Sequence, residues 1–176
     1  CGRNHEYMGE DPYLVSTMTV PYIKGVQSNH VATCVKHFAL NNQENRRHST
    51  NVEISDRALY EIYLPAFKAA TVDAGSWSIM GAYMKYKNQH CCHNQYLLND
   101  ILKGEWGWDG VVISDWGGTH DTHQAIYNGL DFFQFFSNFT VFAFSCQLID
   151  LSINLFDCLS ALLQFFNKTQ FFFVSF

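Results

Sequence analysis

The sequence predicts a parallel α/β fold, and three observations support this prediction. Largely apolar runs occur at 31–38, 77–83 and 111–115, and such runs are typical of strands that are buried on both faces of a sheet. Segments with helical periodicity lie between these runs. Each run also ends in polar or aromatic side chains. Because strands that alternate with helices run parallel, we expect the three strand ends to meet at one edge of the sheet.

The first 50 residues are expected to contain a loop, a helix and the first strand. Residues 2–12 have the composition of a loop, since glycines and an Asp-Pro pair mark turns. Apolar residues four positions apart predict a helix over 13–26, with Pro21 as a kink or a break. The first strand follows this helix. The polar stretch 41–48 predicts a long loop, and because such a loop is costly to order it is a candidate functional segment.

Three helices are predicted after the first strand. Ser55 or Asp56 is a candidate cap for the first of them, and Asn94 is a candidate cap for the second. Gly75 is expected to end the first helix, because glycine adopts the backbone conformation that follows a helix at little cost. With these signals the predicted helices cover 55–75, 96–102 and 124–127, and one more strand is expected to start at 129–131.

The strand at 111–115 ends in the carboxylate of Asp115, and Trp116 and two glycines follow it. Ligands of parallel α/β folds bind at the carboxyl ends of the strands, so a carboxylate at this point is placed for chemistry. A carboxylate buried within the strand would instead be destabilising unless it were paired. The alternative is structural: Asp115 could cap a following helix near Thr119.

The other strand ends add donors and rings to the same predicted edge. Lys36 and His37 close the first strand, and Tyr83 closes the second. Lysine and histidine can donate hydrogen bonds to hydroxyl groups, and the Trp116 indole offers an apolar face to a sugar ring. The Asp115 carboxylate can attack an electrophilic carbon or stabilise a cation. Together these residues predict a site for a polar, uncharged ligand.

The net charge argues against a nucleic-acid partner, and the spacing of the cysteines argues against a metal site. The formal net charge of −5 argues against a nucleic-acid partner, which would require a basic face. The six cysteines show neither metal-ligand spacing nor a dense disulfide pattern. The run His90-Cys91-Cys92-His93 raises the alternative of zinc, but four adjacent residues cannot all face one ion without distorting the backbone. We therefore predict no metal site, and the compartment and oligomeric state stay open.

The composition changes sharply near residue 131. From Phe132 onward the chain contains 14 of its 16 phenylalanines but only three charged residues, and it has no glycine or proline. A folded continuation would need turn residues, so we expect an ordinary domain over 1–131 and an aberrant Phe-rich tail over 132–176 that lacks a consistent packing partner. A membrane helix over 148–166 is a less favoured alternative, because acidic residues interrupt it. Glycosylation sequons at 138–140 and 167–169 are expected to be accidental.

Several stretches of residues 2–131 match one family in sequence order. The segment resembles glycoside hydrolase family 3, of the β-glucosidase and β-xylosidase type, over about three quarters of the chain. After Lys36-His37-Phe38 the chain continues Ala39-Leu40-Asn41, which favours that branch over the N-acetylglucosaminidases of the family. The matching stretches are Gly2-Arg3-Asn4, Gly9-Glu10-Asp11-Pro12-Tyr13, Lys36-His37-Phe38-Ala39-Leu40-Asn41-Asn42-Gln43-Glu44, Leu64-Pro65-Ala66-Phe67, Leu97-Leu98-Asn99-Asp100, Gly104-Glu105-Trp106-Gly107 and Ser114-Asp115-Trp116-Gly117.

The resemblance implies part of a (β/α)8 barrel that hydrolyses terminal β-glycosidic bonds with retention of configuration and without a cofactor. It implies that Asp115 is the catalytic nucleophile, and that Arg3, Lys36 and His37 bind the hydroxyls of a β-linked glycoside. Tyr83 would lie beside the nucleophile, and Trp116 would line the mouth of the pocket.

Departures from the family pattern leave a second function open. Met84 stands where the family usually has asparagine, and the Phe-rich tail replaces the family's continuation. The resemblance places the opening barrel strands before Cys1 and the acid/base carboxylate on a later domain, so we expect this chain to be a fragment with impaired activity. The alternative function is that of a catalytically inactive remnant or a weak sugar-binding module.

Overall fold

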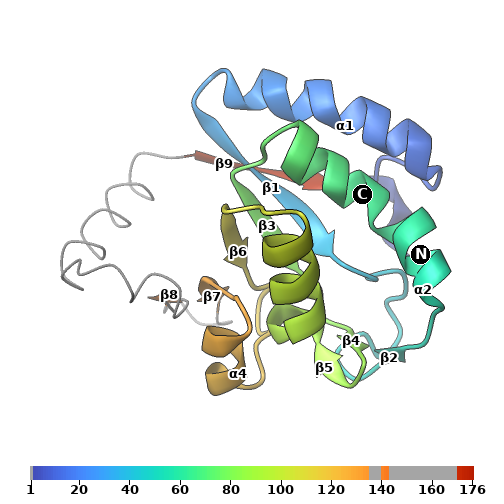
Figure 1. Ribbon diagram of the computed structural model, residues 1–176, viewed down its shortest axis with the longest axis vertical. Helices are drawn as coiled ribbons and strands as arrows, with labels where there is room; N and C mark the ends of the chain where they lie inside the picture. Colours follow the sequence, from blue (N-terminus) through green and yellow to red (C-terminus); the bar gives the residue numbers. More distant parts are fainter. Residues whose placement is uncertain (1, 135–139, 143–169) are drawn as a thin grey trace.

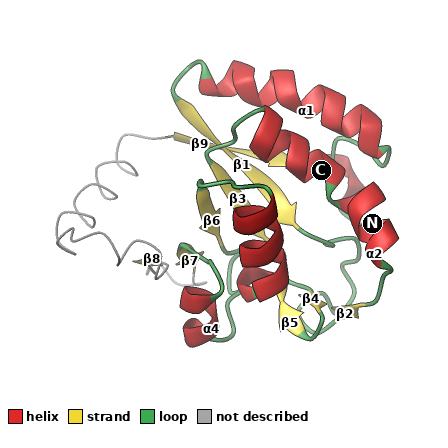
Figure 2. Cartoon of the chain, in the orientation of Figure 1, coloured by secondary structure: helices red, strands yellow, loops and turns green. Residues whose placement is uncertain are grey.

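The computed structural model describes residues 2–134, 140–142 and 170–176. Their main sheet has six strands, which lie side by side in the order β8 (Thr140–Phe142), β7 (Phe132–Gln134), β6 (Val111–Ile113), β3 (Ser78–Gly81), β1 (Val31–Phe38) and β9 (Gln170–Ser175). The helix α1 (Pro12–Gln27) runs above β1 and β9, and the helix that begins at α2 (Asp56–Ala58) lies next to α1 (Figure 1). Figure 2 shows that the long helices lie together on one side of this sheet.

Four neighbouring strands confirm the predicted parallel α/β fold. The strands β1 (Val31–Phe38), β3 (Ser78–Gly81), β6 (Val111–Ile113) and β7 (Phe132–Gln134) follow one another in chain order and pair in parallel. The strands predicted at 31–38, 77–83 and 111–115 are therefore present. Sequential parallel strands with helices between them are the repeating units of a (β/α)8 barrel, and this chain forms part of such a barrel.

Side chains alternate between the two faces of this sheet, as the strand period of two requires. Val35, Ile79 and Val112 face the helices and belong to the main core, which also contains Leu64 and Leu98. The residues adjacent to these three face the other way, and with Phe132 of β7 they form a second, smaller cluster, which consists of Cys34, Met80, Ile113 and Phe132. Both faces are thus apolar, which explains why the strands appear in the sequence as nearly continuous apolar runs.

The predicted helices are present, with corrected boundaries. Asn94 caps the second predicted helix, because its side chain accepts a hydrogen bond of 2.9 Å from the Leu97 N–H. Ser55 caps the first, accepting from the Ala58 N–H at 3.2 Å. The helical segments are Asn4–Glu6, α1 (Pro12–Gln27), α2 (Asp56–Ala58) continued by Leu59–Tyr63, α3 (Pro65–Lys68) continued by Ala69–Asp73, Cys91–His93, Tyr96–Glu105 and α4 (Thr122–Tyr127).

Two alternatives that the sequence left open for the helices are wrong, namely a break at Pro21 and Asp115 as a helix cap. Helix α1 does not break at Pro21 but continues to Gln27. Pro21 is on the exposed side of the helix, where water can hydrate the carbonyl that proline leaves unpaired. Asp115 does not cap the following helix, since Asp121 caps α4 by accepting from the Gln124 N–H at 3.0 Å.

A small second sheet was not predicted. It consists of β2 (Asn51–Val52), β4 (Lys85–Tyr86) and β5 (Gln89–His90). The turn between β4 and β5 uses Lys87 and Asn88 with positive φ angles of 52° and 64°, as a tight hairpin requires. Strands of two residues carry too little periodicity to be recognised in a sequence.

The expectation that residues from 132 onward lack a packing partner is wrong for the part of this segment that is described. Phe132 pairs with Ile113 in β6, and β7 also pairs antiparallel with β8 (Thr140–Phe142). The strand β9 (Gln170–Ser175) pairs in parallel with β1 over six residues. The physical reason is that the edge of β1 presents unpaired backbone groups, and an aromatic and β-branched segment satisfies them well.

Two other expectations fall largely outside the described residues. These are the alternative of a membrane helix over 148–166 and the two sequons at 138–140 and 167–169. In the described parts of the chain, no helix combines the length and the apolar character that crossing a membrane requires.

Candidate active site

The Asp115 side chain lies just beyond the carboxyl end of β6 and is buried. Its Oδ1 accepts a hydrogen bond of 2.7 Å from the backbone N–H of Trp116. Its Oδ2 lies 3.5 Å from Nε2 of His37, which is in β1. The carboxyl ends of two parallel strands therefore converge on this carboxylate, as the sequence predicts.

Burial and hydrogen bonding act in opposite directions on Asp115. Burial raises the pKa of this carboxyl above its ordinary value, because a charged group loses hydration in the interior. The Trp116 N–H and the positive charges of Arg3 and Arg47 act in the other direction and favour the ionised form. The site thus holds a partly desolvated carboxylate with cations nearby.

His37 is buried and uncharged. Burial, with the positive charges of Lys36 and Arg3, lowers the pKa of His37 to about 3. On its Nδ1 side the ring lies 2.8 Å from the Tyr7 hydroxyl and 3.3 Å from Nδ2 of Asn41. The imidazole is therefore held by polar contacts on both of its nitrogens. The peptide bonds Lys36–His37 and Phe38–Ala39 are cis.

Tyr83 lies just beyond the end of β3 and is buried near the Asp115 carboxylate. Its hydroxyl donates a hydrogen bond of 2.8 Å to the backbone carbonyl of Trp116. The Arg47 guanidinium lies 4.5 Å from the centroid of the Tyr83 ring, and the His48 ring centroid lies 4.3 Å from it. The polar loop that the sequence marks as a candidate functional segment therefore reaches the site through Arg47 and His48.

Arg3 and Lys36 are joined by one shared acidic residue. Lys36 Nζ donates to Oε2 of Glu6 at 3.2 Å, and Arg3 Nε contacts the other oxygen of the same carboxylate. Burial acts to raise the pKa of Glu6, but the hydrogen bonds from Arg3 and Lys36 hold it below the ordinary value. A second acidic residue, Glu44, lies 3.9 Å from Arg3 and 2.7 Å from Arg47.

Small residues let the loop of Asp115 pack closely on Cys92. A Cβ atom at Gly118 would lie 2.7 Å from Sγ of Cys92, and one at Gly81 would lie 2.9 Å from the Cys92 Cα. The Gly118 N–H also donates to the Asp115 carbonyl at 2.9 Å. Glycine is therefore required at both positions to bring β3, the Asp115 loop and Cys92 together.

The run His90-Cys91-Cys92-His93 does not gather around one point. Cys91 and Cys92 are buried and donate to the carbonyls of Ala39 and Ala82, each at 3.3 Å. In the part of the chain that the structure describes, no group of three or more candidate ligands could hold a metal ion.

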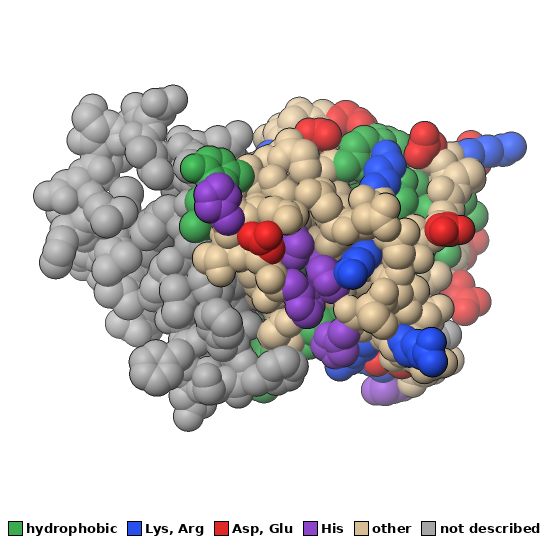
Figure 3. Space-filling model, turned by 90° about the horizontal axis from the view of Figure 1, so that it is seen from below, with side chains coloured by type: hydrophobic (Ala, Val, Ile, Leu, Met, Phe, Trp, Pro, Cys, Tyr) green, Lys and Arg blue, Asp and Glu red, His purple; other side chains and the backbone are tan. Residues whose placement is uncertain are grey.

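Histidines do gather on one face of the molecule, which Figure 3 shows in purple. The His90 ring stacks on the His120 ring with centroids 3.8 Å apart, and the centroid of the His93 ring lies 5.5 Å from that of His90. His90 Nδ1 also lies 2.9 Å from the backbone carbonyl of Tyr83. This histidine cluster therefore supports the backbone next to the candidate site.

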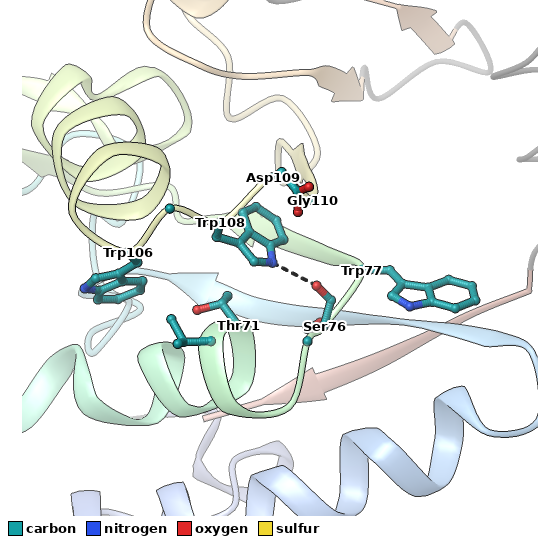
Figure 4. Close-up of a pocket in the computed structure, with 10 residues that line it drawn as sticks. Thr71, Ser76, Trp77, Trp106, Trp108, Asp109 and Gly110 are labelled. Atoms are coloured by element: carbon teal, nitrogen blue, oxygen red, sulfur yellow. Dashed lines mark hydrogen bonds between the residues drawn. The ribbon is translucent and has the colours of Figure 1, made fainter.

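Two cavities are informative about the position of the site. One, of about 410 Å³, is lined by Tyr7, His37 and Asn41 and so adjoins the candidate site. The other, of about 520 Å³, lies before the first residues of β3 and β6, at the opposite end of the strands (Figure 4). Trp108 lines this second cavity, and its indole N–H donates to the Ser76 carbonyl at 2.9 Å. No predicted site residue lines it.

The structure thus brings together Asp115, His37 and Tyr83, with Arg3 and Lys36 connected through Glu6. Trp116 is 57% exposed, and the hydrogen bonds that join it to Tyr83 and Asp115 are made by its backbone. Sequence reasoning singled out none of the following contacts of the site: Glu6, Tyr7, Asn41, Glu44, Arg47 and His48. The polar loop at 41–48 was the available signal for the last four of these.

Comparisons with known proteins identify similar chains. Residues 1–129 match the sequence model of the glycosyl hydrolase family 3 N terminal domain. The chain is 65% identical over 130 residues to beta-glucosidase BoGH3A of Bacteroides ovatus, covering 74% of this chain and 17% of that protein. It is 48% identical over 131 residues to thermostable beta-glucosidase B of Acetivibrio thermocellus, with the same coverage.

A solved structure agrees with these sequence matches. The beta-glucosidase of Kluyveromyces marxianus in complex with glucose superposes with a TM-score of 0.75 and 44% identity, over 87% of this chain and 18% of that chain. The chain therefore spans less than a fifth of the length of each of these three relatives.

Proposed function

The chain belongs to glycosyl hydrolase family 3, and from this membership we propose that it carries the nucleophile-bearing part of a β-glycosidase active site. The reaction is hydrolysis of a terminal β-glycosidic bond, of the β-glucosidase or β-xylosidase type. Relatives that carry the name beta-glucosidase, at 65% and 48% identity, support this substrate class. In this proposal residues 1–131 are the barrel segment, and residues 132–176 are a segment foreign to the family.

Asp115 acts as the nucleophile of a retaining mechanism. One carboxylate oxygen attacks the anomeric carbon while the bond from that carbon to the leaving oxygen breaks, which gives a covalent glycosyl ester. A second carboxyl group, about 5–5.5 Å from the first in retaining enzymes, protonates the leaving oxygen and later activates the water that hydrolyses the ester. By family resemblance this second group lies on a later domain.

The remaining site residues bind the sugar or support the nucleophile. Arg3 and Lys36 are cationic donors that share Glu6, and they bind the sugar hydroxyls. His37 supports the nucleophile instead, because both of its ring nitrogens already contact other side chains of the site. Tyr83 orients the loop of the nucleophile through its 2.8 Å hydrogen bond to the Trp116 carbonyl. The exposed Trp116 indole offers an apolar face at the mouth of the site.

One observation carries the proposal above the others. A buried carboxylate at the end of β6 lies 3.5 Å from a neutral imidazole at the end of β1, with cationic groups close by. A carboxylate that only stabilised the fold would be expected to form a full ion pair or a helix cap. Asp115 does neither with a described residue, and burial raises its pKa, as is common for groups at catalytic sites.

Turnover of an activated aryl β-glucoside tests this proposal, because such a leaving group hardly needs a proton donor. We expect slow release by the wild-type chain, and a loss of about 10³-fold or more in Asp115→Asn, since a neutral amide cannot attack the anomeric carbon. Asp109→Asn, an exposed site at the other end of the sheet, is the matched control and should keep the wild-type rate. Equal rates for the two variants would contradict the role of Asp115.

The second candidate function is sugar binding without turnover. The observation that favours it is coverage, since the chain spans 17% of BoGH3A and the acid/base group is expected elsewhere. Binding of glucose, followed by NMR titration, without any release from the aryl glucoside would support this function and contradict the first.

A further inference from the structure

A chain of polar contacts leads from the surface of the 410 Å³ cavity to the candidate nucleophile. Asn41 Nδ2 donates to the Tyr7 hydroxyl at 3.0 Å, and both groups contact Nδ1 of His37, at 3.3 Å and 2.8 Å. On the other side of the ring, His37 Nε2 faces Oδ2 of Asp115 at 3.5 Å. His37 is 3% exposed and Asn41 is 7% exposed, so these contacts are made in the interior.

A neutral imidazole has one donor and one acceptor nitrogen, so the contacts on one side constrain the proton on the other. An ionised Asp115 favours the proton on Nε2, because an unprotonated Nε2 would direct its lone pair at a carboxylate oxygen. Nδ1 must then accept a hydrogen bond. Tyr7 and Asn41 are the two groups in reach of it, and both can donate.

The orientation of the Asn41 amide agrees with this assignment. With its NH2 group toward Tyr7 and His37, only the Oδ1 atom has no hydrogen-bond partner among the described residues. If the amide were turned over, two buried N–H donors would lie where that oxygen lies now. Leaving two donors unpaired costs more than leaving one acceptor unpaired, so the donating orientation is favoured.

We propose that Tyr7 and Asn41 are positioning residues, which hold His37 in the tautomer whose Nε2–H points at Asp115. The inference rests on the proposed function in one respect, namely that Asp115 must be ionised to react. The effect on the reaction is indirect: the Nε2–H favours the charged carboxylate, and Tyr7 and Asn41 act only through the imidazole. Neither residue was assigned a role by the sequence or by the family match.

The test is to determine the tautomer of His37 by NMR, from the ring nitrogen and proton resonances of this chain with isotope-labelled histidines. The His37→Gln variant identifies which signals belong to His37. We expect the proton on Nε2 in the wild type. Asn41→Asp replaces a donor by an isosteric acceptor 3.3 Å from Nδ1, so we expect this variant to carry a proton on Nδ1. Tyr7→Phe removes one donor and should shift the Nδ1 resonance.

Tyr63→Phe is the matched control. Tyr63 lines the same cavity, but its hydroxyl accepts from Asn42 and does not contact His37. This variant should leave the His37 resonances as they are in the wild type. A wild-type proton on Nδ1, or an Asn41→Asp variant whose His37 is unchanged, would overturn the proposal.

A pH profile links the tautomer to the nucleophile. We expect the acid limb of covalent labelling of Asp115 by a fluorinated glycoside to move up by about one pH unit in Asn41→Asp, because the charged carboxylate then no longer faces an N–H on Nε2. An unshifted acid limb would overturn the positioning role. If Asp115 is not labelled in any variant but the tautomer changes as expected, the proposed function fails while the assignment of the tautomer stands.

Discussion

At the scale of single residues, Asp115 must be ionised for its proposed role as nucleophile. Its buried surroundings disfavour the ionised form. Its pKa is raised in the folded chain, mainly by burial. A group whose pKa is raised on folding stabilises the folded chain most when it is protonated. This stability is fully present below the pKa that the group has in the unfolded chain, and it is lost as the pH rises through the pKa that it has in the folded chain. The carboxylate therefore destabilises the fold at neutral pH, as is common at reactive sites.

The Asp115→Asn variant tests this energetic cost. At neutral pH we expect its free energy of unfolding to exceed that of the wild type by on the order of 1 kcal/mol, because the amide is not charged. The gain should vanish at a pH below the ordinary carboxyl pKa of 3.8. Urea unfolding at the two pH values measures both effects, and a loss of stability at neutral pH would contradict this account. Asp109→Asn again serves as the exposed control.

His37 predicts the opposite dependence on pH. Its pKa falls from 6.5 to about 3 on folding, so the stability it contributes is present above pH 6.5 and is lost as the pH falls toward 3. Each such group adds a slope of at most about 1.4 kcal/mol per pH unit. We expect His37→Gln to reduce the acid sensitivity of the free energy of unfolding, whereas a substitution of the exposed His123 should not. Equal slopes for wild type and His37→Gln would show that this histidine is not the cause.

At the scale of elements, β9 has the least expected role. It covers the edge of β1, and its end connects to the site: Met8 N–H donates to the Ser175 carbonyl at 3.2 Å, and Phe176 N–H donates to the Lys36 carbonyl at 3.1 Å. The Phe176 ring also packs against Phe67, with centroids 5.4 Å apart. The last strand therefore helps to hold both the loop that carries Glu6 and the end of β1.

A substitution on the buried face of β9 tests this role. Val174 is 2% exposed and pairs with Val35, so Val174→Asp should cost about 3 kcal/mol and increase amide hydrogen exchange along β1. Phe173→Thr, at a 47% exposed position on the opposite face of the same strand, is the control and should change stability by less than about 0.5 kcal/mol. Unchanged exchange in β1 for Val174→Asp would contradict the pairing.

The elements also show which parts of the structure a sequence can predict. The strands β1, β3 and β6 were predictable because both of their faces are buried, which leaves long apolar runs in the sequence. The pairing of β9 was not, because strand partners far apart in sequence are chosen by tertiary placement. The contacts of Arg47 and His48 with Tyr83 could not be predicted from the sequence either. They depend on the conformation of a loop in which Arg46 has a φ of +54°.

The site residues also divide into those that the sequence could predict and those that it could not. Asp115, His37 and Tyr83 were predictable as a group, since the ends of neighbouring parallel strands must meet at one edge. Tyr7 and Asn41 reach His37 from loops, and no periodicity marks loop residues that meet in space.

At the scale of the whole molecule, the chain is one part of a barrel. Four parallel strands in chain order share an inner face of Cys34, Met80, Ile113 and Phe132, and the chain spans 17% of BoGH3A. The activity of a site that is assembled from more than one domain should depend strongly on the catalytic groups that each domain supplies. By family resemblance, the acid that protonates the leaving oxygen is proposed to lie on a later domain.

The dependence on the leaving group tests this idea. We expect an activated aryl glucoside to be cleaved slowly and an unactivated disaccharide not at all, because only the disaccharide needs a proton donor for its leaving oxygen. The ratio of the two initial rates, measured on one preparation, is the readout. Comparable rates for the two substrates would indicate an acid/base group within this chain and contradict the proposed division.

Asp115 is proposed to form the covalent bond to the sugar, and one measurement tests this role most directly. The full-length chain is incubated with a fluorinated glycoside that carries a good leaving group, digested and analysed by mass spectrometry. We predict a glycosyl adduct on the peptide that contains Asp115, and none in Asp115→Asn. An adduct on another carboxylate, with Asp115 unmodified, would contradict the assignment of the nucleophile.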